Sequence, residues 1–407
     1  MQEFNILTLS NGIRFIHWRN NSKIAHCGIT INTGTRDELE NEHGLAHFIE
    51  HVIFKGTTHR KSYHIISRLE DIGGDLNAYT AKEETCIYAS ILTSDFERAA
   101  ELIADIMFNS TFPEKELSKE KEVVFDEINS YKDSPSELIF DDFEEQVFEG
   151  APIGRNILGT KKNLRAFDKK SILAFMQRTY NSDQLVFSSA GDIPFNTVKR
   201  IAEKYFGHYP PNYRNYNRIP FTGYLPKLVE KHKSTYQAHC IIGNVAYDLK
   251  SEKRVALHLL TNMLGGPGMN SRLNLSLREK YGLAYNVEAS YSPYTDTGIV
   301  SIYFGTDKGN IQKSINLVNK ELARIRDVKI SVLQLHKAKK QLIGQLAIAA
   351  ESNESQMLSI GKSLLIYNTV DSQEEVARKI NTITAENLQE VANEVFSPDQ
   401  LSTLIFR

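Results

Sequence analysis

Hydrophobic and polar positions along the chain predict strands and helices in alternation. Short runs rich in β-branched and other apolar residues occur at 24–32, 84–92 and 184–193, and such runs are typical of strands. The run at 95–108 repeats its apolar residues at helical spacing and predicts an amphipathic helix. Apolar faces of both kinds are buried when helices cover a sheet, so the pattern favours sheets covered by helices.

An internal repeat organises the chain. Residues 25–56 are echoed by residues 238–266, and each stretch predicts a strand, a polar connection and a buried helix. A second pair, 117–128 and 335–346, follows the same period of a little over 200 residues. The sequence therefore predicts a duplicated scaffold.

The segment 207–227 separates the two copies. It is rich in Pro, Asn and Tyr and follows neither the helical nor the strand period, which is typical of an extended connector. A chain of 407 residues also exceeds what one hydrophobic core normally fills. We therefore expect a first domain at 1–208, a linker at 209–228 and a structurally similar second domain at 229–407.

The first predicted buried helix contains an H-x-x-E-H string formed by His47, Glu50 and His51. Two imidazoles four residues apart lie on one helix face, and a carboxylate projects beside them. Zinc binds neutral imidazole and lowers the pKa of a water molecule in its open position, so a nearby carboxylate can take the proton. The alternative is a pair of hydrogen-bonded core histidines, but three titratable groups on so apolar a helix favour a metal site.

A catalytic zinc usually takes three protein ligands, and the run at 114–131 offers candidates for the third. Its helical period defines an apolar stripe made of Leu117, Val123, Val124 and Ile128. Glu120 and Glu127 fall inside that stripe, two turns apart, so one can bind the metal while the other orients a ligand. The alternative is a solvated charged helix, which we accept for Lys119, Lys121 and Glu122 of the same run.

The second copy keeps the apolar pattern and loses the candidate ligands. His258 corresponds to His47, but Thr261 and Asn262 replace Glu50 and His51. Ala338 and Gln345 stand where Glu120 and Glu127 stood. We therefore expect one functional site, in the first copy, and an unligated His258.

Composition narrows the class of protein. Hydrophobic residues make up 41% and charged residues 24%, as in folded domains, and a net charge of −2 predicts no nucleic-acid or anionic-membrane partner. The first residues show neither a basic nor an apolar leader, which predicts a cytoplasmic protein. The three cysteines, Cys27, Cys86 and Cys240, are widely spaced, so we expect small buried side chains rather than disulfides or a thiolate site.

The string HFIEH, followed 76 residues after His51 by the second glutamate of an E-x6-E pair, resembles the pitrilysin-type (inverzincin, M16) metallopeptidases. This family includes insulin-degrading enzyme and the mitochondrial processing peptidases, and the resemblance covers nearly the whole chain. It implies that His47, His51 and Glu127 bind Zn²⁺. It further implies that Glu50 is the general base and that Glu120 supports the site.

The resemblance also implies substrate-binding residues and a fold. Within 73–89, Asn77, Ala78 and Tyr79 stand at substrate-lining positions, and Arg278 and Tyr285, seven apart, match an arginine and a tyrosine that reach the substrate. The implied fold is α+β, with two homologous domains, each a largely antiparallel sheet covered by helices. The family hinges these domains as a clamshell.

Three functions follow from this resemblance. The leading expectation is a zinc endopeptidase that hydrolyses peptides or unfolded polypeptide segments. A leader-specific processing peptidase acting with a paralogue is an alternative, and a non-catalytic scaffold subunit is another that the intact set His47, Glu50, His51 and Glu127 disfavours. Because the chain is about half as long as four-domain members, we expect a homodimer or a heterodimer with a paralogue.

Overall fold

The structure, a computed structural model, describes residues 4–407 and separates them into two compact units. The first unit comprises the chain up to Ile128, Arg155–Arg218 and Ile348–Ser372. The second comprises Asn129–Gly154, Ile219–Ala347 and Gln373–Arg407. Each unit contains its own sheet and its own hydrophobic core, as expected for a chain of this length.

A six-stranded sheet forms the centre of the first unit, in the order β1-β2-β6-β3-β5-β4. Its strands are β1 (Phe4–Thr8), β2 (Arg14–Arg19), β3 (Ile24–Ile31), β4 (Asp75–Thr80), β5 (Thr85–Leu92) and β6 (Leu185–Gly191). Its helices are α1 (Leu45–Val52), α2 (Ser62–Glu70), α3 (Phe96–Asn109), α6 (Lys161–Ala166), α7 (Lys169–Thr179), α8 (Phe195–Phe206) and α12 (Asn353–Tyr367). The helix α4 (Glu114–Lys132) begins in this unit and ends in the second.

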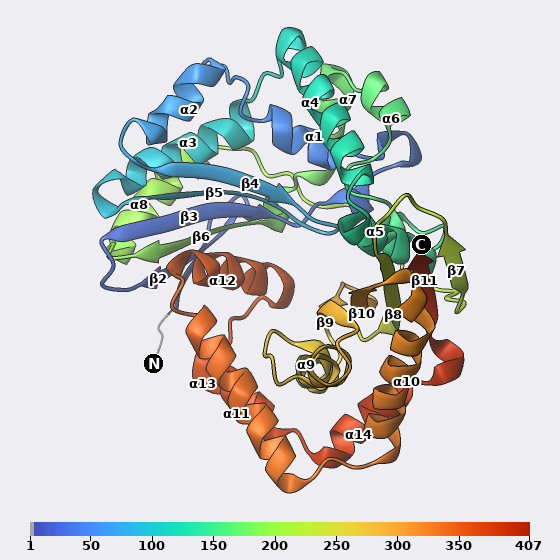
Figure 1. The fold of residues 1–407 in the computed structure, drawn as a ribbon. Coiled ribbons are helices and arrows are strands. Elements are labelled where there is room, and N and C mark those ends of the chain that lie inside the picture. Colours follow the sequence, from blue (N-terminus) through green and yellow to red (C-terminus); the bar gives the residue numbers. More distant parts are fainter. Residues whose placement is uncertain (1–3) are drawn as a thin grey trace. The chain divides into compact units, whose positions relative to one another are not determined.

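Both faces of this sheet are covered, because successive side chains of a strand point to opposite sides. Phe15 and Phe187 pack into the main core with α1, α3 and α8. Their neighbours Ile16 and Val186 pack on the other face against α12. Figure 1 shows α12 on one side of this sheet, with α1, α2 and α3 on the other.

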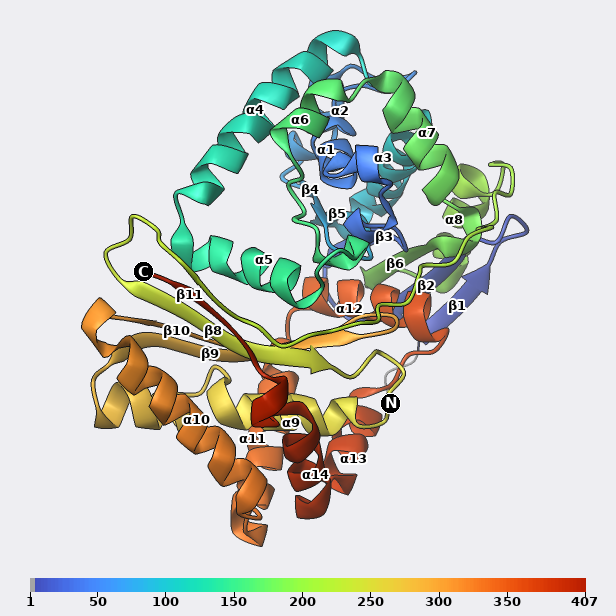
Figure 2. The same ribbon diagram turned by 90° about the vertical axis from the view of Figure 1, so that its right-hand side faces the viewer.

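A five-stranded sheet forms the centre of the second unit, in the order β7-β11-β8-β10-β9. Its strands are β7 (Leu228–Lys231), β8 (Ala238–Ala246), β9 (Ala284–Pro293), β10 (Gly298–Thr306) and β11 (Ser402–Phe406). Its helices are α5 (Pro135–Val147), α9 (Arg254–Gly265), α10 (Ile311–Asp327), α11 (Val332–Ala349), α13 (Gln373–Thr382) and α14 (Ala385–Val395), with a π-helical segment at Asn274–Lys280. Figure 2 shows α5 on one side of this sheet and α9, α10 and α14 on the other.

The two sheets correspond strand for strand, which confirms the predicted homology of the halves. The series β2-β6-β3-β5-β4 of the first matches β7-β11-β8-β10-β9 of the second, and β1 is an addition. The parallel pair occupies the same place in both, β2 with β6 and β7 with β11, while the other pairs are antiparallel. Each half is therefore the largely antiparallel α+β unit that the sequence predicted.

Two helices belong to the unit that their sequence position does not suggest. In the second unit, Phe143 of α5 packs with Ile241 and Leu404 of the sheet. In the first unit, Ile360 of α12 packs with Val186, and Gly361 permits this approach because a Cβ there would lie 2.7 Å from Ser188 Oγ. The predicted domains were continuous stretches of sequence. They therefore did not include the placement of α5 in the second unit and of α12 in the first.

The predicted connector at 209–228 forms no helix, and its only strand residue is the first of β7. It is nevertheless fixed to the first unit by Arg218, whose guanidinium donates to both oxygens of the fully buried Asp37 carboxylate at 2.7 and 3.0 Å. Arg218 also donates to the backbone carbonyl of Glu83 at 2.9 Å. Beyond Arg218 the chain enters the second unit, where the Phe221 N–H donates to Asp296.

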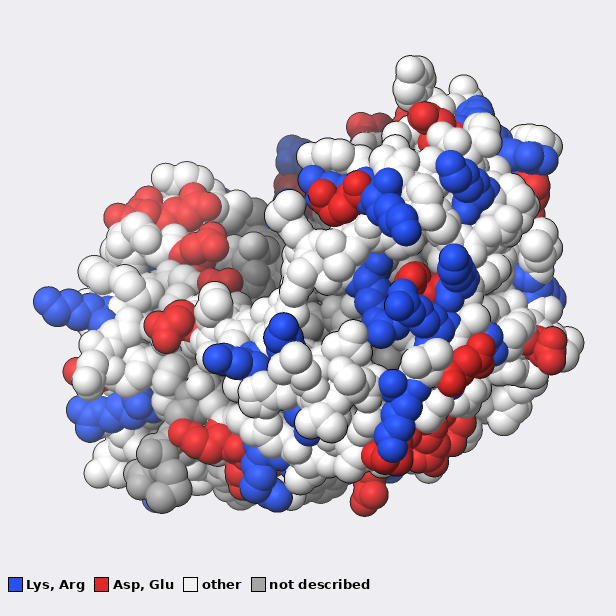
Figure 3. Space-filling view, turned by 60° about the horizontal axis from the view of Figure 1, so that its bottom comes forward, with Lys and Arg blue, Asp and Glu red and all other residues white. Residues whose placement is uncertain are grey.

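Charges of both signs occur on the face of the molecule drawn in Figure 3. This face carries small groups of Lys and Arg side chains (blue) and small groups of Asp and Glu side chains (red). This mixture is expected from 48 basic and 50 acidic residues. Within residues 4–407, every helix is too short or too polar to cross a membrane.

Candidate metal centre

The helix α1 is buried along most of its length, as its apolar sequence predicts. The buried side chains are Leu45, Ala46, His47, Phe48, Ile49 and Val52. Gly44 precedes the helix in the left-handed region at φ +94°, and a Cβ there would lie 2.7 Å from the Cα of Gly159. A glycine is therefore required both for the backbone turn and for the close approach of the segment around Gly159.

His47, His51 and Glu127 lie together, although 76 residues separate the last two. The Nε2 atom of His51 is 3.3 Å from a Glu127 carboxylate oxygen, and Nε2 of His47 is 3.8 Å from the other. One ligand atom from each residue lies within 4.8 Å of the other two. Within residues 4–407 this is the one group of three or more His, Cys, Asp or Glu side chains so arranged.

This donor set fits zinc. Two imidazole nitrogens and one carboxylate oxygen are ligands that zinc takes in catalytic sites, where three protein ligands leave one position open. The imidazole rings of His47 and His51 are 4.7 Å apart and inclined at 73°, so they converge without stacking. His47 is only 7% exposed, a position where an imidazole needs a partner.

The surroundings give the two imidazoles different protonation behaviour. Burial and the neighbouring His51 lower the pKa of His47 to about 4, so this ring is neutral at ordinary pH. Burial also lowers the pKa of His51, but its hydrogen bond to Glu127 and the charges of Glu127, Glu50 and Glu120 outweigh that effect and raise it. The hydrogen bond from His51 in turn lowers the pKa of Glu127.

Glu50 projects from α1 beside this group, and it is not one of the three converging residues. Burial raises the pKa of its carboxyl above the ordinary value, and the negative charge of Glu127 acts in the same direction. A carboxylate with a raised pKa is a better proton acceptor near neutral pH. The structure thus separates three candidate ligands from one candidate base.

Glu120 lies on the far side of His51 from Glu127. One of its oxygens is 3.6 Å from His51 Nδ1, and the other is 2.7 Å from the Nζ atom of Lys55. Lys55 was not predicted from the sequence; a helix continuing past His51 would place it on the same face, but α1 ends at Val52. The prediction that Val123 belongs to the buried stripe is wrong: Val123 is 49% exposed because α4 buries a narrower stripe made of Leu117, Val124 and Ile128.

Asn77, Ala78 and Tyr79 lie on β4, the last strand of the first sheet, and α1 packs against this strand. Asn77 pairs with Tyr88 of β5 on one side, and no strand within residues 4–407 pairs with β4 on the other. The Tyr79 hydroxyl donates to the buried carboxylate of Glu84 at 3.3 Å. The three candidate substrate residues therefore border an open sheet edge next to the helix of His47.

Arg278 and Tyr285 meet in the second unit. Arg278 lies on the π-helical segment, and its guanidinium carbon is 5.1 Å from the centre of the Tyr285 ring, within range of a cation–π contact. Tyr285 is near the start of β9 and is 82% exposed. The two residues, seven apart in sequence, thus form one local pair with an accessible phenol.

Among the described residues, the one group that could hold a metal lies in the first copy, and the corresponding residues of the second copy make other contacts. His258 is exposed, with its ring 4.6 Å from that of Tyr291. The Thr261 hydroxyl, at the position of Glu50, donates to carbonyls of its own helix. The cysteines Cys27, Cys86 and Cys240 are free and buried, and their burial agrees with the prediction of small buried side chains.

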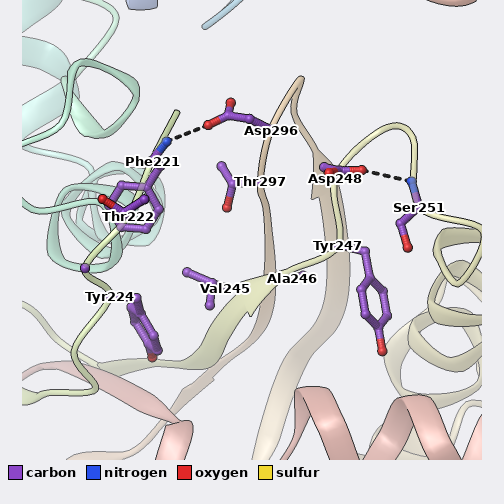
Figure 4. Close-up of a pocket in the computed structure, with 11 residues that line it drawn as sticks. Phe221, Thr222, Tyr224, Val245, Ala246, Tyr247, Asp248, Ser251, Asp296 and Thr297 are labelled. Atoms are coloured by element: carbon purple, nitrogen blue, oxygen red, sulfur yellow. Dashed lines mark hydrogen bonds between the residues drawn. The ribbon is translucent and has the colours of Figure 1, made fainter. Parts of the chain in front are cut away.

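A separate hollow of about 420 Å³ lies in the second unit (Figure 4). The connector lines it with Phe221 and Tyr224, and the turns around Asp248 and Asp296 close it. Both carboxylates accept backbone hydrogen bonds, Asp248 from Ser251 at 2.8 Å and Asp296 from Phe221. These contacts hold turns in place, so we assign this hollow no chemistry.

Comparisons with known proteins show the family to which the chain belongs. Residues 14–161 match the family described as Insulinase (Peptidase family M16), and residues 166–342 match the Peptidase M16 inactive domain. A protein of Bacillus subtilis, named an uncharacterised zinc protease, is 34% identical over 98% of this chain and 97% of its own. The chain belongs to peptidase family M16. A Rickettsia felis zinc protease, also uncharacterised, is 32% identical over 99% of this chain and 98% of its own.

Solved structures share the fold of this family member over its whole length. A protease from Helicobacter pylori superimposes with a TM-score of 0.89 at 20% identity, covering 100% of both chains. A peptidase M16 inactive domain from Pseudomonas fluorescens gives a TM-score of 0.92 at 18% identity, covering 99% of this chain and 97% of that one. These likenesses establish the fold of two homologous domains.

Proposed function

We propose that this family M16 protein is a zinc-dependent endopeptidase that hydrolyses peptides or unfolded polypeptide segments. The convergence of His47, His51 and Glu127, with Glu50 beside them and outside the ligand group, carries this proposal. The zinc protease relatives support it. In the second half the corresponding positions hold no such group, so one zinc per chain is expected.

The residues of the site have different roles in peptide hydrolysis. His47, His51 and Glu127 would hold the metal, and a bound zinc supplies a Lewis acid that polarises the scissile carbonyl and lowers the pKa of water. Glu50 takes the proton of the attacking water. Its raised pKa makes the Glu50 carboxylate a better proton acceptor near neutral pH. Glu50 then delivers that proton to the departing amine. Glu120 orients the His51 ring through Nδ1.

The open edge of β4 supports the choice of an extended substrate. The backbone N–H and C=O groups on the side of β4 away from β5 can pair with an added strand. Such pairing binds peptide main chain with loose sequence preference. Asn77 is exposed on this strand, and Ala78 and Tyr79 are half-buried. A segment locked in a folded protein cannot offer its main chain in this way, so peptides and unfolded segments are the proposed substrates.

Separating the base from the ligands tests this proposal. Glu50→Gln should retain about one zinc per chain and lose nearly all hydrolysis of a mixed peptide library. Glu122→Gln, which removes an exposed carboxylate from α4, is the matched control and should retain both properties. Full activity of Glu50→Gln would remove Glu50 as the base. A wild-type protein that takes up no zinc and cleaves no peptide would refute the function.

A further inference from the structure

The Lys55 side chain is tied to the candidate metal centre through Glu120. Its Nζ atom is 2.7 Å from one Glu120 oxygen, and Nδ1 of His51 is 3.6 Å from the other. His51 is thus placed between two carboxylates, Glu127 at Nε2 and Glu120 at Nδ1. The Nδ1 atom of His47, in contrast, is buried and has no hydrogen-bond partner among the described residues. Orientation by a second carboxylate is therefore specific to His51.

This ion pair differs from an ordinary surface pair. The Glu120 side chain is 12% exposed and that of Lys55 is 23% exposed, so water screens their attraction only partly. Among the described residues, Lys55 and His51 are the only side chains that pair with Glu120. Without Lys55, the largely buried Glu120 carboxylate would lose its ammonium partner. Rotation of the Glu120 side chain toward water would then be favoured.

The charges around the site also require a cation here. Glu50, Glu120 and Glu127 place three carboxylates around His51. The two positive charges of a zinc ion and the one of Lys55 balance these three negative charges. A half-buried site is more stable when its charges are matched, so Lys55 completes an otherwise unbalanced centre.

We propose that Lys55 is a positioning residue of the metal centre, which holds Glu120 so that its second oxygen orients the His51 imidazole for metal binding. This inference rests on the proposed function of the site. Lys55 lies beyond Glu120, which itself lies beyond the candidate ligands. Within residues 4–407, Lys55 forms no ion pair with the three candidate ligands or with the candidate base. Outer partners of this kind typically change metal affinity 10- to 100-fold, which sets the expected effect at about that size.

The experiment measures zinc affinity of the full-length chain by competition with a chromogenic chelator, and the thermal midpoint of the metal-free protein. Lys55→Met should weaken zinc binding about 10- to 100-fold, and Lys55→Arg should recover most of it because a cation remains. Lys119→Met is the matched control, since within residues 4–407 the exposed Lys119 side chain pairs with Glu116 of the same helix at 2.8 Å and with none of the residues of the site. Its zinc affinity should equal that of the wild type.

A double variant separates positioning from general stability. If Lys55 acts through Glu120, Lys55→Met combined with Glu120→Gln should bind zinc as weakly as Glu120→Gln alone. The inference would be overturned if the losses of zinc affinity from the two substitutions multiplied in the double variant. It would also be overturned if Lys55→Met left the zinc affinity unchanged. If Lys55→Met does not fold, equal zinc affinity for Lys55→Gln and Lys55→Arg would overturn it. A wild-type protein without zinc affinity would refute the proposed function itself, so the two failures are distinguishable.

Discussion

The Glu38 carboxylate accepts a hydrogen bond from the backbone N–H of Ala46 at 2.8 Å, in the first turn of the helix that carries His47 and His51. Its other oxygen accepts from the N–H of Gly44 at 2.9 Å. No side chain at the N-cap position satisfies these donors, because that position is Gly44. A residue six positions upstream therefore caps the helix of the metal centre.

Glu38→Ala should lower the free energy of unfolding by about 1–3 kcal/mol, because two backbone donors at a buried helix start lose their acceptor. Denaturant unfolding of the metal-free protein measures this change. Glu40→Ala, two residues away at an exposed position, should have an effect within about 0.5 kcal/mol. Equal stability of the two variants would mean that Glu38 does not support α1.

Zinc binding should release a proton from His51 in mildly acid solution. The carboxylates around His51 raise its pKa above the ordinary value, whereas that of His47 is lowered to about 4. Only the neutral ring binds metal, so at about pH 6 loading must displace roughly one proton. Zinc affinity consequently falls as the pH drops through the raised pKa of His51. Calorimetric titration in two buffers of different ionisation enthalpy measures the released protons, and a count near zero at that pH would contradict this expectation.

Tyr285→Phe should reduce peptide turnover by roughly 10- to 1,000-fold if its hydroxyl stabilises the oxyanion, as the family resemblance implies. Its exposure and its contact with Arg278 predict little effect on zinc content or thermal midpoint. Single-turnover rates on several peptides, together with metal analysis, provide the measurement. Tyr281→Phe, a less exposed tyrosine near the same π-helical segment, is the control. Unchanged turnover in Tyr285→Phe would remove this residue from the mechanism.

Lys362→Met should weaken substrate binding without affecting the metal. The Lys362 ammonium donates at 2.8 Å to the Glu84 oxygen that also accepts from Tyr79, so this helix residue supports the turn after β4. Losing one charged contact of about 1 kcal/mol predicts a KM several-fold higher, with unchanged zinc affinity. Lys199→Met, at an exposed site on α8, is the control. A KM equal to that of the wild type would show that the turn is held without Lys362.

The local features of the site could be predicted from the sequence because helix geometry fixes them. His47, Glu50 and His51 share one turn, and Glu120 and Glu127 lie two turns apart on one helix, whatever the rest of the chain does. The assignment of Val123 failed because a helical period fixes the direction of a side chain but not the width of the surface that covers it. Val123 is exposed because the buried stripe of α4 is narrower than its helical period predicts.

The sequence by itself determined the repeat, the sheets covered by helices and the residues that can bind a metal, because these depend on patterns within a few turns or strands. Tertiary structure decided which elements meet. It brought Glu127 to His51, paired Lys55 with Glu120, left β4 at a sheet edge, and placed α5 and α12 on the sheets of the opposite halves. The physical reason lies in the duplication, since two homologous sheets offer matching apolar faces. An amphipathic pattern specifies that such a face must be covered, but long-range packing selects the helix that covers it.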